Sequence, residues 1–155
     1  MSIETTLVLV KPDAVARGLI GEVIRRFERR GLAVLAIKGF VFTDELLREH
    51  YAHLADRPFF PRLAEYMKSD LTVALAIAGV DAVQVVRTMV GETNSRTAQP
   101  GTIRGDLAVS VQRNAVHASD SPESALLEVA RFFPDGLSVS PDTARVCDNY
   151  ATDEL

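Results

Sequence analysis

One histidine, His117, stands in a sequence that could support nucleophilic chemistry. It follows a short apolar run and precedes a predicted helix in the segment RNAVHASDSPESA, where Asn114, Ser119 and Asp120 surround it. The positive charge of an imidazolium is disfavoured near a helix N-terminus, so a ring nitrogen stays free to attack, and the same helix end attracts phosphate. The alternative is a loop histidine without a chemical role, and the local sequence leaves both interpretations open.

A nucleophilic imidazole needs an acceptor that holds its second ring nitrogen. Glu128 lies 11 residues after His117 and could reach back from the following helix. Helical periodicity opposes this, because it places Glu128 opposite the apolar stripe of that helix and therefore in water. The predicted stripe comprises Leu126, Val129, Ala130 and Phe133.

The chain contains neither of the common glycine-rich phosphate loops, G-x-x-x-x-G-K-[ST] and G-x-G-x-x-G. Side chains would therefore have to bind a phosphate, and Arg57, Arg87 and Arg104 are candidates. An exposed arginine without a ligand is the ordinary alternative for each of them. Lys11 closes the apolar run LVLVKPD, where it is either a surface charge or part of a site at which strand ends converge.

Aromatic residues offer a second type of contact. Phe59 opens a phenylalanine pair in RPFFPRL, which is typical of core packing but could also form a platform on which a flat base stacks. Tyr51 and His50 share a helical stripe with Leu47 and Leu54, so periodicity predicts that both are packed in the core.

Composition limits the possible functions. The 155 residues are most simply one domain, with 47% apolar and 25% charged residues. A net charge of −4 provides no basic surface for nucleic acid or an anionic membrane, and no apolar run approaches the roughly 20 residues that a membrane span needs.

Two features favour the cytoplasm. The N-terminal segment MSIETTLVLVKPD has an acidic residue where a secretory signal would be positively charged. The single cysteine, Cys147, excludes an internal disulfide and suits a reducing compartment.

Hydrophobic periodicity predicts strands that alternate with helices. The predicted strands are residues 5–13 (stopping at Pro12), 32–42, 71–79 and 107–112. The predicted helices are residues 19–31, 43–55 (with Thr43 as N-cap), 61–69 and 81–91, and one that begins after His117 with Asp120 or Ser121 as cap. This order favours an α+β fold, the ferredoxin-like split βαβ arrangement, in which helices pack on one face of a four-stranded antiparallel sheet.

Two polar segments have no predicted element. Residues 92–106 form a loop of about 15 residues, and loops of that length in a compact domain are usually functional or disordered. Residues 134–155 form a polar C-terminal tail.

Five motifs carry a resemblance to a known family. TLVLVKPDAV, HYAHLADRPFFPRL, VVRTMVGETN, PGTIRGD and RNAVHASDSPESALLEVARFF occur in this order. Together they resemble the nucleoside diphosphate kinases over residues 5–133. The resemblance implies a ping-pong transfer of the terminal phosphoryl group from a nucleoside triphosphate to a nucleoside diphosphate, which maintains the triphosphate pools. It also implies Mg²⁺ carried by the nucleotide phosphates, with no metal ligand from the protein and with Asp120 in contact only through water.

The same resemblance assigns catalytic roles by position. His117 matches the residue that carries the phosphoryl group, and Glu128 matches the carboxylate that orients its ring. Tyr51 and Ser119 match supporting residues around the histidine. Residues 92–106 resemble the loop that lines the site and meets neighbouring subunits, which implies a homo-oligomer, either a tetramer or a hexamer.

Nucleotide contacts follow in the same way. The phosphate ligands match Arg87, Thr93 and Arg104. Lys11 and Asn114 match residues that contact the sugar and assist at the transferred phosphoryl group. Phe59 matches the ring on which the base stacks; because every base has a π-face, no base preference follows.

The chain also departs from the family pattern. Ala118 replaces a glycine, which matters only if that position needs a positive φ angle. Ser69-Asp70-Leu71 stands where the family usually has Ser-Gly-Pro, and Ser95 replaces a proline, which predicts a less rigid loop and a weaker oligomer. The tail matches poorly and has no tryptophan.

Two rival functions remain from other classes. A nucleotide-binding or scaffold module without turnover would be favoured if His117, Lys11 or Arg104 were missing, and all are present. An RNA-binding ferredoxin-like domain is opposed by the acidic balance and by the predicted strand LAVSVQ, which has no aromatic platform.

Overall fold

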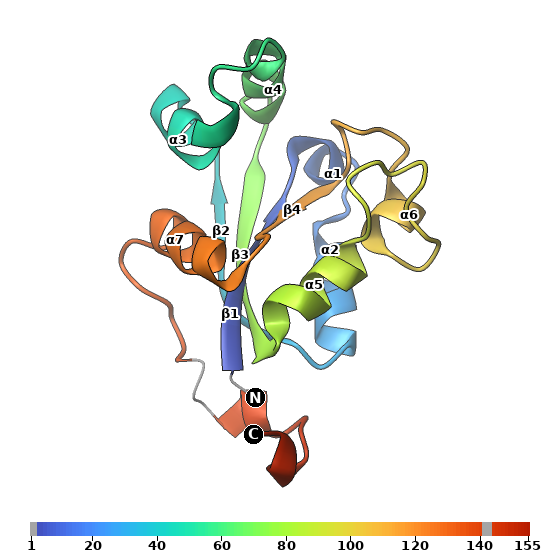
Figure 1. The fold of residues 1–155 in the computed structure, drawn as a ribbon, viewed down its shortest axis with the longest axis vertical. Helices are drawn as coiled ribbons and strands as arrows, with labels where there is room; N and C mark the ends of the chain where they lie inside the picture. Colours follow the sequence, from blue (N-terminus) through green and yellow to red (C-terminus); the bar gives the residue numbers. More distant parts are fainter. Residues whose placement is uncertain (1–2, 141–143) are drawn as a thin grey trace.

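The strands form an antiparallel sheet in the order β2-β3-β1-β4 in a computed structural model that describes residues 3–140 and 144–155 (Figure 1). The strands are β1 (Ile3–Val10), β2 (Ala33–Phe40), β3 (Thr72–Val80) and β4 (Val116–Ala118). The helices are α1 (Pro12–Ala16), α2 (Ile20–Arg29), α3 (Asp44–His50), α4 (Phe60–Met67), α5 (Ala82–Val90), α6 (Ile103–Leu107), α7 (Pro122–Phe132) and α8 (Ala144–Cys147), with 3₁₀ turns η1 (Ala52–Leu54) and η2 (Thr152–Glu154). This architecture confirms the predicted α+β fold with a four-stranded antiparallel sheet.

Helices cover both faces of this sheet, which corrects the expected packing on one face. Side chains alternate between the faces along a strand, so Val8 and Val10 of β1 pack with Val23 and Phe27 of α2 and with residues of α5. Leu7 and Leu9 point the other way, into a cluster with residues of α3, α4 and α7. Figure 1 shows α2 and α5 on one side of the sheet and α7 on the other.

Side-chain caps begin two of the helices that surround the site. Thr43 Oγ1 accepts a hydrogen bond from the Leu46 N–H at 3.2 Å, which confirms the predicted N-cap of α3. Ser121 Oγ accepts from the Ser124 N–H at 3.1 Å, so Ser121 rather than Asp120 caps α7. Both caps define where the following helix starts relative to the sheet.

The predicted fourth strand over residues 107–112 is wrong. The strand at this edge is β4, which begins at Val116 and pairs with β1, so His117 lies within a strand and not after it. The alternating Val109 and Val111 are 82% and 48% exposed. Period-two alternation indicates a strand only when one set of side chains has a core to enter, and no such core lies beside these valines.

The predicted apolar stripe of α7 is confirmed in part. Val129 and Phe133 pack against the core, but Leu126 is 72% exposed and Ala130 is also exposed, while Ala125 and Phe132 are the buried residues of this helix. The helix is therefore rotated relative to the orientation that hydrophobicity favours. This rotation brings Glu128 to the inner side of α7.

The described parts of the two polar segments, residues 92–106, 134–140 and 144–155, contain more regular structure than expected. Residues 92–106 contain the start of α6, and Asp106 forms an ion pair with Arg26 of α2 at 2.9 Å. In the tail, Val146 is buried, and Tyr150 Oη accepts a hydrogen bond from the Val80 N–H at 2.9 Å. The tail thereby covers the β3 end of the sheet.

Two glycines provide a matched test of local packing. A Cβ at Gly105 in α6 would overlap the backbone oxygen of Gln99, whereas a Cβ at Gly21 in α2 would meet open space. We expect Gly105→Ala to lower the free energy of unfolding by about 1–3 kcal/mol, because the loop must move to accommodate the methyl group. We expect Gly21→Ala to raise it by about 0.5 kcal/mol. Urea unfolding at fixed protein concentration measures both, and equal stabilities would contradict the close approach at Gly105.

Candidate active site

The position of His117 is set by the pairing of β4 with β1. His117 pairs with Leu9, while its neighbours Val116 and Ala118 pack into the core on the opposite face. The side chain of His117 therefore emerges on the face that α7 covers.

A tight turn precedes this strand. Ala115 has a φ of 69°, and the Val116 N–H donates to the Asn114 carbonyl at 2.8 Å, which is the pattern of a γ-turn. Asp13 Oδ2 accepts the Ala115 N–H at 3.1 Å, and the Lys11 N–H donates to the Ala115 oxygen at 2.8 Å. Contacts from Lys11, which follows β1, and from Asp13 of α1 thus hold a backbone conformation that an alanine rarely adopts. Asp13 is not among the residues that the sequence motifs predict for the site, because the residue that it holds is 102 positions away.

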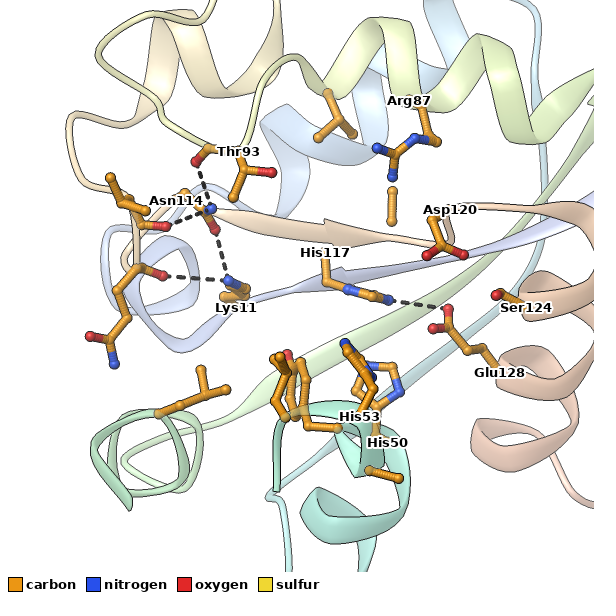
Figure 2. A pocket seen from close by; sticks show the side chains of 18 of the residues that line it. Lys11, His50, His53, Arg87, Thr93, Asn114, His117, Asp120, Ser124 and Glu128 are labelled. Atoms are coloured by element: carbon orange, nitrogen blue, oxygen red, sulfur yellow. Dashed lines mark hydrogen bonds and ion pairs between the residues drawn. The ribbon is translucent and has the colours of Figure 1, made fainter. Parts of the chain in front are cut away.

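Glu128 holds one nitrogen of the His117 ring. His117 Nε2 lies 3.1 Å from Glu128 Oε2 (Figure 2), and Ser119 Oγ donates to the same oxygen at 2.6 Å. Burial by itself raises the pKa of Glu128, but the hydrogen bonds from His117 and Ser119 oppose it, and the pKa lies below its usual value. An ionised carboxylate accepts a hydrogen bond from the Nε2–H group of a neutral imidazole. In that tautomer Nδ1 carries a free lone pair.

An aromatic cluster packs against His117. The His50 ring is 5% exposed, and its centroid lies 4.7 Å from that of His117 in an edge-to-face arrangement. Burial, followed by the neighbouring His117, lowers the pKa of His50 to about 3, so His50 is neutral. Tyr51 is also buried, and burial raises its pKa. The structure therefore confirms that His50 and Tyr51 are packed side chains, and it places both beside the candidate nucleophile.

Cationic side chains line the other side of His117. Lys11 Nζ donates to Asn114 Oδ1 at 2.7 Å, and Asn114 Nδ2 donates to the Thr93 carbonyl at 3.0 Å. Figure 2 shows Lys11 and Asn114 on the opposite side of His117 from Glu128. Burial and the charge of Arg104 lower the pKa of Lys11 to about 8.

Arg104 is oriented by backbone oxygens. Its guanidinium donates to the carbonyls of Val116 at 2.7 Å and Gly91 at 3.1 Å. Burial and the charge of Arg87 lower the pKa of Arg104 to about 10, so it remains protonated at neutral pH. Two fixed cations and a neighbouring arginine make this wall suited to an anion of several charges.

The predicted residues converge on a cavity of about 1050 Å³. Its lining includes Lys11, Tyr51, Phe59, Arg87, Thr93, Arg104, Asn114, His117 and Glu128. Ser119 is not among the described residues that line the cavity, but its hydroxyl donates a hydrogen bond to Glu128. Phe59 is 44% exposed, as a stacking platform requires. Arg57 is not among the described residues that line this cavity.

Arg131 and His53 also line the cavity, although no motif in the sequence had singled them out. Arg131 is paired with Glu49 at 3.0 Å and also contacts His50. Helical spacing could have indicated Arg131, because it lies one turn after Glu128 on α7 and therefore on the same side of the helix. The predicted apolar stripe, however, placed Glu128 in water.

Comparison with known proteins bears directly on this site. A family model described as nucleoside diphosphate kinase matches residues 4–137. The nucleoside diphosphate kinase of Parabacteroides distasonis is 50% identical over 152 residues, which cover 98% of this chain and 99% of that protein. The chain belongs to the nucleoside diphosphate kinase family. It is therefore a nucleotide-binding phosphotransferase whose ligands are nucleoside di- and triphosphates.

Other members of the family extend the likeness. Nucleoside diphosphate kinase 3 of Homo sapiens is 50% identical over 130 residues, which cover 84% of this chain and 77% of that protein. The halophilic nucleoside diphosphate kinase of Halobacterium salinarum, solved in complex with CDP, has a TM-score of 0.90 and 38% identity and covers 97% of this chain and 100% of that one. These relatives confirm the predicted fold and family.

The departures from the family pattern are accommodated in this enzyme. Ala118 lies in β4 and is not among the described non-glycine residues with a positive φ angle. Ser95 is buried, and its hydroxyl donates to the Ser110 carbonyl at 3.0 Å, which ties down the long segment that a proline would otherwise stiffen. Residues 69–71 turn into β3, with Asp70 Oδ1 accepting the Leu71 N–H at 2.7 Å.

The lowered pKa of Lys11 predicts a specific dependence of stability on pH. Between pH 8 and 10.5 the unfolded chain keeps a proton on Lys11 that the folded chain has lost. Stability rises with pH wherever the unfolded state binds more protons, so this group makes the enzyme more stable as pH rises through that window. We expect the free energy of unfolding of nucleotide-free wild type, measured with urea, to rise relative to that of Lys11→Met between pH 8 and 10.5. Parallel pH profiles would show that Lys11 keeps an ordinary pKa.

Proposed function

We propose that this family member transfers the terminal phosphoryl group between nucleotides in two half-reactions, through a phosphohistidine at His117. The observation that carries the proposal is the contact of His117 Nε2 with Glu128, which leaves Nδ1 free in a cavity that Lys11, Arg87 and Arg104 also line. A fixed acceptor on one nitrogen is what a nucleophilic imidazole needs on the other.

In the first half-reaction His117 Nδ1 attacks the terminal phosphorus of a nucleoside triphosphate. The N–P bond forms while the bond from phosphorus to the bridging oxygen breaks, and the nucleoside diphosphate leaves with the bonding electrons. The Nε2 proton stays between the ring and Glu128, whose charge stabilises the positive phosphoimidazole. No proton has to leave the site.

In the second half-reaction a terminal oxygen of an acceptor diphosphate attacks the same phosphorus. The N–P bond breaks, its electrons return to Nδ1, and the free enzyme is restored. One site serves both steps because donor and acceptor differ by one phosphoryl group. Such exchange would maintain the nucleoside triphosphate pools.

Positioning and charge neutralisation supply most of the catalysis of phosphoryl transfer. We assign the phosphates to Arg87, Thr93 and Arg104, and the sugar and transferred group to Lys11 and Asn114. Arg104 is held by three backbone carbonyls, so little ordering of its side chain is needed when the nucleotide binds.

The base would stack on Phe59 at the cavity mouth, an arrangement that tolerates any base. The CDP complex of the Halobacterium salinarum relative supports a diphosphate as a ligand of this fold. Tyr51 and Ser119 would support the His117 ring, Tyr51 by packing and Ser119 through Glu128.

The site fits a Mg²⁺ ion that arrives on the nucleotide. Magnesium prefers oxygen ligands, retains several waters and usually takes only one or two protein carboxylates. Asp120 lines the cavity, and a hydrogen bond from Ser124 lowers its pKa, so an ionised carboxylate is available for contact through water. When bound, the ion would neutralise charge on the phosphates.

We further infer one catalytic domain that assembles into a homo-oligomer, a tetramer or a hexamer, in the cytoplasm. β2 is an edge strand, and Ile37 and Val41 beside that edge are 57% and 56% exposed, which supports contact with another copy. Among the described residues no helix is both long and apolar enough to cross a membrane.

Labelling with γ-phosphate-labelled ATP tests the phosphohistidine. With Mg²⁺ and no acceptor, wild type should retain a label that resists base, is lost in acid and leaves on addition of GDP. His117→Ala should take no label, since it lacks the attacking nitrogen. If wild type binds ATP but takes no label, the two-step mechanism is wrong and a module that binds nucleotide without turnover becomes the better description.

Glu128→Gln tests the carboxylate separately from the nucleophile. Glutamine keeps an oxygen that can accept from both His117 and Ser119 but removes the negative charge. We expect the rate of phosphorylation to fall by about 10²-fold, with nucleotide affinity unchanged, because the charge acts on the phosphoimidazole that forms. Single-turnover labelling and calorimetric ADP binding measure the two quantities. A loss of affinity without a loss of rate would place Glu128 among the binding residues instead.

A further inference from the structure

All three histidines of the chain, His50, His53 and His117, line the same cavity. Two of them, His50 and His117, join Glu128 in a group whose ligand atoms all lie within 4.8 Å of one another. Two imidazoles and a carboxylate are a ligand set that Zn²⁺ binds in proteins, with a fourth position left open. The open position would face the cavity.

His50 provides an independent observation at this group. Its side chain is buried, and within the described part of the chain Nε2 has no hydrogen-bond partner. Buried polar atoms nearly always have a partner, so an unpartnered one in a functional cavity requires an explanation. The reaction derived above makes no use of His50.

We propose that the nucleotide-free enzyme binds one divalent transition metal of the Zn²⁺ class through His50 Nε2, His117 Nε2 and Glu128, and that this metal blocks phosphorylation of His117. Tetrahedral zinc ligands lie about 3.4 Å apart, and His117 Nε2 and Glu128 Oε2 are already 3.1 Å apart. His50 is therefore the ligand that has to approach. The binding step stands independently, whereas the blocking of phosphorylation rests on the proposed function.

The position of the ring proton on His117 explains why a bound metal would prevent phosphorylation. Without metal, the His117 proton is on Nε2, facing Glu128. The metal takes the place of this proton, and the neutral ring keeps its hydrogen by carrying it on Nδ1. The nitrogen that attacks phosphorus then has no free lone pair. Metal–nitrogen and metal–oxygen bonds form, one N–H bond is exchanged for another, and no oxidant or reductant is involved.

Arg131 opposes this binding. Arg131 Nη1 donates to His50 Nδ1 at 3.3 Å, and because a guanidinium only donates, the His50 proton must be on Nε2. Metal at Nε2 moves that proton to Nδ1, where it would face the Arg131 N–H, so Arg131 has to turn away. It can keep its ion pair with Glu49, 3.0 Å away. Arg131 thus limits access of transition metals to the nucleophile.

Mg²⁺ does not compete for this group. It prefers oxygen ligands, whereas imidazole nitrogen suits zinc, copper and nickel. The experiment can therefore be carried out with an excess of Mg²⁺, as the transfer reaction requires. The nearby cations Lys11, Arg87 and Arg104 also oppose a bound dication, so the affinity is expected to lie well below that of a structural zinc site.

Zn²⁺ titration of the nucleotide-free enzyme, followed by competition with a chromophoric chelator, measures the binding without turnover. We expect one Zn²⁺ per chain in wild type and an affinity lower by at least about tenfold in His50→Phe, which keeps an aromatic ring but no ligand. Arg131→Met should raise the affinity by about tenfold. His53→Gln is the control, because His53 lines the cavity outside the three-residue group, and it should leave the affinity unchanged.

Co²⁺ supplies a second measurement, since a four-coordinate site gives strong visible absorption that should appear in wild type and be lost in His50→Phe. Equal affinity in wild type and His50→Phe would overturn the site, as would the absence of one-to-one binding in both wild type and Arg131→Met.

Zn²⁺ added before labelled ATP should prevent labelling of His117. An enzyme that transfers phosphate but binds no Zn²⁺ refutes the metal site alone. An enzyme that binds Zn²⁺ but takes no label from ATP when Zn²⁺ is absent refutes the proposed function alone.

Discussion

The contact between His117 Nε2 and Glu128 Oε2 is the constraint on which the site depends. It requires a carboxylate with only 14% of its side chain exposed to remain ionised, and two donors, from His117 and Ser119, meet at the same oxygen to make this possible. The two sides of the contact come from different elements, β4 and α7. The sheet must hold both, and it does so through β1, which pairs with β4 and contacts α7.

One face of the sheet packs into the core with α2 and α5, and the other face carries the residues of the candidate active site. Val116 and Ala118 are in the core formed with α2 and α5, while His117 between them faces α7. The burial of a charged group on the chemical face has a cost, which is visible in the lowered pKa of Lys11. The positive φ angle of Ala115 in the turn before β4 is a second, conformational cost. Hydrogen bonds across the ends of β1 and β4 offset these costs. The result is a wall of donors that is already oriented before a phosphate arrives.

The arrangement by which we propose that His117 acts as a nucleophile would also suit it as a metal ligand, because both roles need a neutral imidazole with an accessible lone pair. His50 brings a second imidazole to within ring contact, and Glu128 provides the oxygen. Arg131 separates the two roles by holding His50 in the tautomer that does not bind metal at Nε2. A single arginine on α7 would then decide which ligands the cavity accepts.

Sequence alone determined the elements whose partners are local or whose burial is complete. The periodicity of α2, the apolar run of β3 and the Thr43 cap are properties of short segments, and the five motifs were sufficient to identify the family and the residues that converge on the cavity. Only the tertiary structure decided which edge segment pairs with β1 and which side of α7 faces inward. Those outcomes depend on partners far away in the chain, such as the Leu7 N–H that Ser119 accepts across 112 positions. Local hydrophobicity favoured residues 107–112 as a strand and Glu128 in water, but strand pairing and the compensation of a buried charge outweighed it.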